Sequence, residues 1–307
     1  MVHRFLTGAL VVVLMLAAPL ATALTLSRGA AAQATPEVAA VVSPCDADAS
    51  LYAASDDPVS LGTVPEGLAF HLLATGEADA MPTPPLFLQV TRLSLDPGAG
   101  SETRMAGGPI LFYVEAGAIT FYVDGVPTTV PAGGSLTAPS LSLYALANEG
   151  EEVGSVMRFA LAPQGDNGAI MVMPTAEPVL SVPPTGAPRS EALYSVEVTM
   201  LPAPSARLFL ACLTWEQAEA TLGAWRLPGP VGLRVERGQL RIDDALELGA
   251  GGCTLLDGES AHRLAPGAEP PELLLFGVIP VATMLWTSPT DGEVGPPPAP
   301  SRLTCGG

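Results

Sequence analysis

Hydrophobic, β-branched and aromatic residues recur in short runs along the chain, and turn-forming residues end each run. Residues 108–125, GPILFYVEAGAITFYVDG, hold two such runs, which Glu-Ala-Gly separates and Asp-Gly closes. This pattern predicts the two strands of a β-hairpin. Similar runs fill about 68–161 and 194–285, and only EQAEATLGAW at 216–225 has a tempting helical period. The chain is therefore predicted to be all-β.

Changes in composition divide the chain into six segments. Ala, Ser, Asp and Pro dominate the part before the first strands, and Pro and Gly dominate a stretch between the two strand-rich regions. We expect a signal peptide at 1–34, a weakly ordered lead-in at 35–61, a first barrel at 62–162, a linker at 163–190, a second and more divergent barrel at 191–286, and a Pro-rich tail at 287–307.

The first segment has the features of an export signal. MVHR gives a short basic start, Phe5–Leu26 carries no charge, and Ala32-Gln33-Ala34 has the small-x-small pattern of a cleavage site. We therefore predict a cleaved signal peptide and a secreted or extracytoplasmic bacterial protein. The alternative is an uncleaved anchor, because an uncharged stretch of this length can span a bilayer. Only that alternative predicts contact with a membrane.

The charge of the chain excludes several classes of partner. All 13 basic residues are arginines against 31 acidic residues, which gives a net charge of −18. Loss of residues 1–34 removes Arg4 and Arg28 and leaves 11 − 31 = −20. A chain without lysine offers no Schiff-base chemistry, and so acidic a chain is not expected to bind nucleic acid. Strong acidity is typical of solubility rather than of a specific partner.

Four cysteines, Cys45, Cys212, Cys253 and Cys305, occur in the chain. An even number in an exported protein allows two disulfides with three connectivities. Cys45 and Cys305 lie near the two ends, so a bridge between them would tie down both tails. The alternative for Cys212 and Cys253 is a pair of reduced, buried cysteines in strands.

The two strand-rich regions resemble two copies of one unit. LFLQVTRLSL at 86–95 is similar to LFLACLTW at 208–215, ILFYVEAGAITF to VGLRVERGQLRI, and AGGSLTAP to AGGCTLLD. With Gly133 set on Gly251, the alignment continues without a gap and places Tyr144 opposite His262.

The segments TRLSLDPGAG, PILFYVEAGAITFYVDG and VPAGGSLTAPSLSLYALANEG resemble the two motifs of the cupins. In the second copy, VERG and GGCTLLDGESAHRL carry a weaker resemblance. The resemblance implies two double-stranded β-helix (jelly-roll) barrels in tandem, which is the architecture of a bicupin. This fold hosts many unrelated chemistries, so the resemblance does not name a function.

The family typically binds a divalent metal with a His-x-His pair, a Glu and a further His. Counted back from Gly117, these positions fall at Thr103, Met105, Ile110 and Tyr144, and in the second copy at Ala224, Arg226, Val231 and His262. Only His262 is the residue that the family uses, and the mature chain has just one other histidine, His71. Methyl, thioether and aliphatic groups bind such ions poorly. We therefore expect no cupin-type metal centre and no cofactor.

Strand alternation gives the first barrel an apolar interior. Side chains expected to line it are Thr103, Met105, Ile110, Phe112, Val114 and Tyr144. One interpretation is a core packed with side chains, as in many small barrels. The other is a dry pocket in which the Tyr144 hydroxyl orients a small organic ligand.

In the second barrel, His262 is a candidate general base or anion ligand. If Arg226 also faces inward, it is suited to pair with an acidic ligand. No orienting carboxylate has a recognisable spacing from His262, and Asp257 and Glu259 are the nearest in the chain. The alternative is a hydrogen-bonded core histidine and a surface arginine. His71, on an apolar strand, is expected to be structural.

The sequence thus favours a metal-free bicupin that is a binding or structural module rather than an enzyme. The alternative is a metal-independent epimerase or isomerase with His262 or Tyr144 as acid or base. A metal-dependent oxygenase is disfavoured by the histidine count. The expected partner is a small organic ligand, and the sequence leaves a homodimer open.

Overall fold

The computed structural model describes Cys45 and residues 64–78, 80–163, 169–171, 184–201, 205–258, 260–281 and 303–305. All of them belong to one compact unit, Val42–Gly307. The predicted signal peptide, nearly all of the lead-in and most of the linker and tail lie outside the described residues. The described residues form strands and turns without a helix, so the all-β prediction is confirmed for them. Accordingly, they contain no helix long and apolar enough to cross a membrane.

A six-stranded and a five-stranded sheet make up what we call the N-terminal half. Their strand orders are β20-β11-β2-β9-β4-β7 and β10-β3-β8-β5-β6. The strands are β2 (Leu86–Leu95), β3 (Arg104–Ala106), β4 (Ile110–Ala116), β5 (Ala118–Val123), β6 (Val126–Pro131), β7 (Ser135–Ala138), β8 (Leu143–Ala147), β9 (Gly154–Pro163), β10 (Ala169–Met171), β11 (Arg189–Val198) and β20 (Leu303–Cys305).

The C-terminal half has a five-stranded sheet, β1-β12-β19-β14-β17, and a four-stranded sheet, β13-β18-β15-β16. The strands are β1 (Leu68–Ala78), β12 (Ala206–Trp215), β13 (Leu222–Arg226), β14 (Val231–Arg237), β15 (Gln239–Ile242), β16 (Leu246–Gly249), β17 (Cys253–Leu256), β18 (Ala261–Pro266) and β19 (Glu272–Pro280). The sheets of both halves are open, and their all-β arrangement is consistent with a cupin jelly roll.

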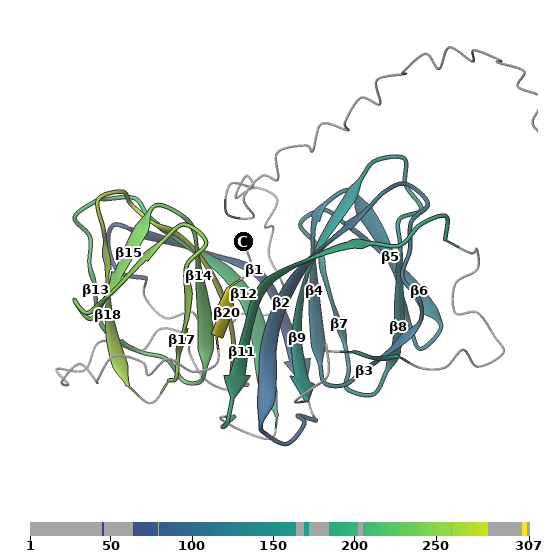
Figure 1. Cartoon of the computed structure of the whole chain (residues 1–307), viewed down its shortest axis with the longest axis horizontal. Helices are drawn as coiled ribbons and strands as arrows, with labels where there is room; N and C mark the ends of the chain where they lie inside the picture. Colours follow the sequence, from purple (N-terminus) through teal and green to yellow (C-terminus); the bar gives the residue numbers. More distant parts are fainter. Residues whose placement is uncertain are drawn as a thin grey trace, which may run out of the picture. The chain divides into compact units, whose positions relative to one another are not determined.

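Each half lends a strand to the other. β1 precedes the N-terminal half in the chain but pairs with β12, and β11 precedes the C-terminal half but pairs with β2 (Figure 1). The sheets therefore do not follow the predicted boundaries at 162 and 191. Because each exchanged strand covers an edge that would otherwise present unpaired N–H and C=O groups, the exchange couples the two halves through backbone hydrogen bonds.

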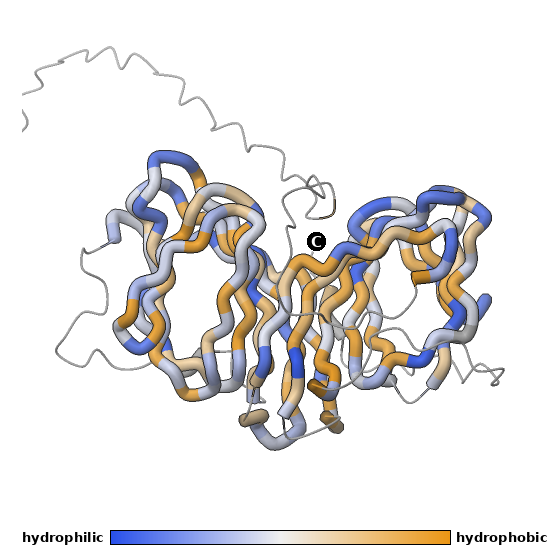
Figure 2. Tube along the Cα trace, turned by 180° about the vertical axis from the view of Figure 1, so that it is seen from behind, coloured by the Kyte–Doolittle hydropathy of each residue, from blue (hydrophilic) through white to orange (hydrophobic). Residues whose placement is uncertain are grey.

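Apolar side chains on both faces of the central strands create three large buried clusters. The interface cluster, shared by the six-stranded sheet and β1-β12-β19-β14-β17, includes Leu88, Tyr113, Phe159, Leu210 and Phe276. The N-terminal interior includes Ile110, Phe112, Phe121, Tyr144 and Val156, and the C-terminal interior includes Leu213, Trp225, Leu233, Leu264 and Leu275. Strands buried on both faces read as continuous apolar runs, which explains ILFYV and the hydrophobic central strands of Figure 2.

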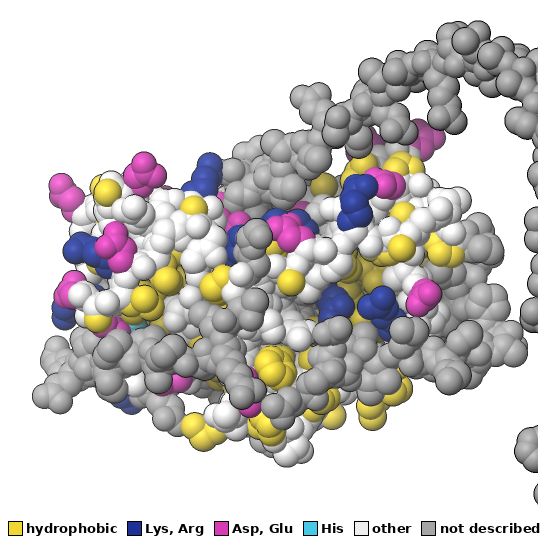
Figure 3. Space-filling model, in the orientation of Figure 1, with side chains coloured by type: hydrophobic (Ala, Val, Ile, Leu, Met, Phe, Trp, Pro, Cys, Tyr) yellow, Lys and Arg dark blue, Asp and Glu magenta, His cyan; other side chains and the backbone are white. Residues whose placement is uncertain are grey.

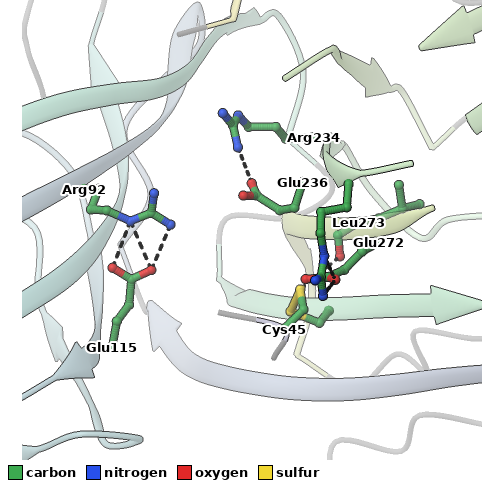
Figure 4. Close-up of a disulfide and its surroundings, with 9 residues drawn as sticks. Cys45, Arg92, Glu115, Arg234, Glu236, Glu272 and Leu273 are labelled. Atoms are coloured by element: carbon green, nitrogen blue, oxygen red, sulfur yellow. Dashed lines mark hydrogen bonds and ion pairs between the residues drawn. A yellow bond between two sulfur atoms is a disulfide. The ribbon is translucent and has the colours of Figure 1, made fainter. Parts of the chain in front are cut away.

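The repeat is visible in matched turns. Gly117 and Gly238 end β4 and β14 with φ of 72° and 73°, a conformation that favours glycine. A shift in strand register precedes each turn. It lies between Val114 and Ala116 in β4 and between Val235 and Arg237 in β14. Glu115 and Glu236 occupy these matched bulges, which are known to re-aim side chains. Both glutamates form ion pairs, with Arg92 and Arg234 (Figure 4).

Two disulfides join the tails to the interface cluster. Cys45 pairs with Cys212, and Cys253 pairs with Cys305, with Cα–Cα distances of 5.5 and 5.9 Å. Of the three possible connectivities, the one with a bridge between Cys45 and Cys305 is therefore not formed, and Cys212 and Cys253 are not reduced. β12 and β17 turn Cys212 and Cys253 towards the interface cluster, where each meets a cysteine of one tail.

Candidate functional site

The register of β3 decides which side chains line the N-terminal interior. Arg104 is the register partner of Tyr144 on β8, and it lies two residues before Ala106 on β3. Tyr144 and Ala106 both belong to the N-terminal interior, so Arg104 faces inward as well. Met105 therefore faces the opposite side, and Thr103 lies just before the strand begins. The predicted inward direction of Met105 is corrected by one residue, because a one-residue slip moves every side chain of a strand to the other face.

The rest of the predicted lining lies inside the N-terminal half. Ile110, Phe112 and Val114 are fully buried there with Tyr144. The ring of Phe112 lies 5.0 Å from that of Phe121 and 5.6 Å from that of Tyr144, measured between centroids. Hydrocarbon groups and one phenol do not fit a divalent metal. Nowhere in the described part of the chain do three or more His, Cys, Asp or Glu residues gather as a metal site would require.

In the C-terminal half, β13 shows the same one-residue correction. Trp225 pairs with His262 and is buried in the interior, whereas Arg226 is exposed. Arg226 therefore does not line the interior, in agreement with the alternative of a surface arginine, and the indole of Trp225 is buried there instead. His262 lies two residues before Leu264 on β18, on the face that lines the interior.

His262 is held by a carboxylate that the sequence did not reveal. Its Nδ1 atom lies 2.7 Å from Oδ2 of Asp243, and their side chains are only 1% and 4% exposed. Asp243 begins the turn between β15 and β16, with φ of 53°. Its Oδ1 accepts a hydrogen bond of 2.7 Å from the backbone N–H of Arg263, and its own N–H donates to the carbonyl of Arg263 over 2.9 Å. Both carboxylate oxygens are thus fixed before any ligand arrives.

The pair determines what the imidazole offers to the interior. A carboxylate facing Nδ1 favours the tautomer that carries a proton there, which leaves Nε2 as a hydrogen-bond acceptor. Nε2 is buried and, within the described residues, has no hydrogen-bond partner. The site therefore presents one oriented acceptor to a predominantly apolar interior.

A turn in the N-terminal half shows how Asp243 could have been identified from the sequence. Asp124 begins the corresponding turn, with φ of 49°, and exchanges hydrogen bonds with the backbone of Leu143, both of 2.8 Å. The same turn is thus built twice, and each time its aspartate grips the strand that follows. Comparing these two turns in the sequence would have identified Asp243 as the carboxylate beside His262. Counting residues from the histidine does not identify it.

The turns also correct the alignment of the copies. Val123 pairs with Tyr144, and Ile242, at the corresponding place before its turn, pairs with Leu264. Tyr144 therefore corresponds to Leu264, two residues beyond His262. Because the shift is two residues, His262 keeps the inward face that the alignment predicted.

No protein-family model matches the chain, and the search of curated proteins finds no match. Among solved structures, salicylate 1,2-dioxygenase from Pseudoaminobacter salicylatoxidans matches with 11% identity and a TM-score of 0.40, covering 64% of this chain and 69% of that one. A mutant oxalate decarboxylase from Bacillus subtilis matches with 12% identity and a TM-score of 0.39, covering 72% and 79%. A putative glyoxylate induced protein from Pseudomonas aeruginosa matches with 14% identity and a TM-score of 0.39, covering 73% and 93%.

These structural neighbours are cupin-family proteins, the family that the sequence resembles. With TM-scores below 0.5, this likeness does not assign a function to the chain.

Proposed function

We propose that this protein is an exported, bicupin-like protein with two jelly-roll barrels, and that its C-terminal barrel binds a small organic molecule without a cupin-type metal. The observation that carries the proposal is the Nε2 atom of His262, which is buried and oriented by Asp243. The ligand donates an N–H or O–H to this atom and places its apolar part beside Trp225.

The energetics support a ligand at this position. A buried acceptor without a partner costs about 1–3 kcal/mol, so a bound donor recovers the free energy that the unpartnered Nε2 atom forfeits. The apolar surroundings strengthen the hydrogen bond because they lower the local dielectric constant.

Export is supported by the two disulfides, because such bonds persist in oxidising compartments. The test is the mass of the purified protein. We expect a mature chain that begins at Thr35 and is four hydrogens lighter than its reduced form. A purified protein that retains residues 1–34 contradicts a cleaved signal.

Native mass spectrometry of the purified protein tests the binding function. We expect a retained organic ligand on the native protein and its loss in His262→Gln, which keeps a polar side chain but moves the acceptor. His71→Gln, at the only other histidine of the mature chain, is the matched control and should retain the ligand. Bare polypeptide in the native protein, or equal retention in His262→Gln, contradicts the proposal.

A second candidate function is acid–base catalysis of the epimerase or isomerase type. The Asp243–His262 pair favours it, because a fixed tautomer makes Nε2 a suitable general base. Tyr144 is not the acid–base partner of His262, because Tyr144 lies in the N-terminal interior and His262 lies in the C-terminal half. If this function holds, the retained ligand exchanges a carbon-bound hydrogen with D2O in the native protein and not in His262→Gln.

A further inference from the structure

Most arginines of the strands around His262 point away from the C-terminal interior. Within β14, β15 and β18, each arginine lies between two residues that face inward, so strand alternation turns it outward. These arginines are Arg234, Arg241 and Arg263. Figure 3 shows acidic and basic side chains projecting from the outer surface where Figure 1 labels β13, β15 and β18. They do not offer a cation to a ligand inside.

One arginine faces the same interior from β12. Arg207 lies two residues before Phe209, and its register partner on β19 is Ile279; both of these belong to the C-terminal interior. Its Nη2 atom lies 2.8 Å from Oε1 of Glu77, so the charge of Arg207 is already compensated. The carboxylate of Asp243 therefore leaves this part of the described interior with a negative charge.

This balance of charge disfavours an acidic ligand. An anion buried here would lie near Asp243 and would have to compete with Glu77 for Arg207. A charge that is buried without a partner is costly, whereas a neutral donor that reaches an acceptor is not. The interior is therefore suited to an uncharged molecule.

The polar groups of the interior define which neutral molecule is suited to it. Nε2 of His262 is an acceptor because Asp243 favours the proton on Nδ1, so the ligand must donate. Thr254 also faces this interior, since it pairs with Leu233. Its hydroxyl group can both donate and accept, and it therefore does not discriminate between ligands. The choice between donors and acceptors is made at His262.

We propose that the C-terminal interior selects an uncharged molecule with a hydroxyl group on an apolar body, such as an alcohol or a phenol. The hydroxyl donates to Nε2 of His262, and Asp243 is the positioning residue that determines this specificity. This ligand class rests on the binding function proposed above and adds to it the charge and the donor group of the ligand.

Titration calorimetry of the purified protein with three probes tests the proposal. Phenol donates a hydrogen bond, benzaldehyde only accepts one, and benzoate is charged. We expect the native protein to bind phenol at least about tenfold more tightly than either of the others. In Asp243→Asn the imidazole proton moves to Nε2, so the preference for phenol over benzaldehyde should fall about tenfold or more. Asp124→Asn, in the matching turn of the N-terminal half, should keep the native preference.

The ratio of the two affinities separates positioning from a structural role, because loss of packing around Asp243 lowers both affinities together. Three results overturn the proposal: no binding of phenol up to about 10 mM, benzoate or benzaldehyde bound as tightly as phenol, or an unchanged ratio in a folded Asp243→Asn protein. Circular dichroism establishes that each variant is folded. If Asp243→Asn does not fold, nitrogen NMR of the native protein decides: phenol should shift the Nε2 resonance of His262, and an unmoved resonance contradicts the proposal.

Failure of this ligand class and failure of the binding function are told apart by native mass spectrometry. A retained ligand that is lost in His262→Gln but is charged, or has no hydroxyl group, overturns the ligand class and leaves the binding function standing. Bare polypeptide in the native protein contradicts the binding function itself.

Discussion

The imidazole Nδ1 of His262 and the carboxylate Oδ2 of Asp243 lie 2.7 Å apart, at the end of the C-terminal interior. The aspartate is fixed by its turn, and the histidine by its strand, so the pair exists before any ligand binds. Such preorganisation is what a binding or catalytic histidine requires.

The first prediction concerns Asp243→Asn. The amide oxygen can still accept from Arg263, but the amide nitrogen now donates to Nδ1 of His262, so the imidazole proton moves to Nε2. Nitrogen NMR of the ring should report this tautomer change, and the free energy of unfolding should fall by about 1–3 kcal/mol. Asp124→Asn, in the matching turn without a histidine, is the control. An unchanged ring spectrum in Asp243→Asn would show that the carboxylate does not set the tautomer.

A second prediction uses Tyr194, which crosses the interface between the halves. Its hydroxyl donates to the carbonyl of Thr254 over 3.1 Å, and its ring meets that of Phe276 edge-on at 4.4 Å. Burial raises the pKa of Tyr194 well above its ordinary value. The unfolded chain therefore releases this proton at lower pH than the folded one.

The stabilising contribution of Tyr194 is consequently complete below about pH 10 and is lost as the pH rises from there towards the folded-state pKa. Denaturant unfolding at alkaline pH should show a declining free energy of unfolding in the native protein. In Tyr194→Phe this decline should be shallower, since phenylalanine does not titrate. Equal slopes in the two proteins would exclude Tyr194 as the source.

A third prediction concerns the buried ion pair of Arg92 and Glu115, whose side chains are 8% and 7% exposed. Glu115 accepts two hydrogen bonds of 3.0 Å from Arg92 and one of 2.6 Å from Ser155. Burial lowers the pKa of Arg92, but the hydrogen bond and charge of Glu115, with the charges of Glu236 and Glu191, outweigh it and raise the pKa overall.

Glu115→Gln should reduce the free energy of unfolding by about 3–5 kcal/mol, because it leaves the charge of Arg92 buried without its main partner. Replacing both residues, as Arg92→Met with Glu115→Leu, should cost less than the single change. Chemical unfolding measures both. The single variant Arg189→Gln breaks an exposed ion pair with Asp96 and should leave the free energy of unfolding nearly unchanged. A double variant less stable than Glu115→Gln would contradict the desolvation argument.

A fourth prediction separates the two disulfides. Cys45–Cys212 closes a loop of 167 residues and Cys253–Cys305 one of 52. In the chain-entropy model the longer loop stabilises more, by about 1 kcal/mol. Each bridge is removed in turn by replacing both of its cysteines with alanine, and the two double variants are compared by unfolding in denaturant. The variant without Cys45–Cys212 should be less stable than the one without Cys253–Cys305. The reverse order would mean that packing in the interface cluster outweighs loop entropy.

The strands, their glycine turns and the inward side chains of β4 were predictable from the amino-acid sequence. Alternation within one strand and the φ of a turn glycine are local properties, so Ile110, Phe112 and Gly117 were predictable without a partner strand. The repeat was readable for the same reason, since each copy contains the same local signals.

The faces of β3 and β13, the exchange of β1 and β11, the disulfide pairs and the partner of His262 became known only from the folded structure. Each of these depends on the register between strands distant in the chain, and a shift of one residue reverses a face. That is why Arg104 and Trp225 replaced Met105 and Arg226 in the interior. Asp243 reaches His262 because two strands are paired, a relationship that spacing along the chain does not encode.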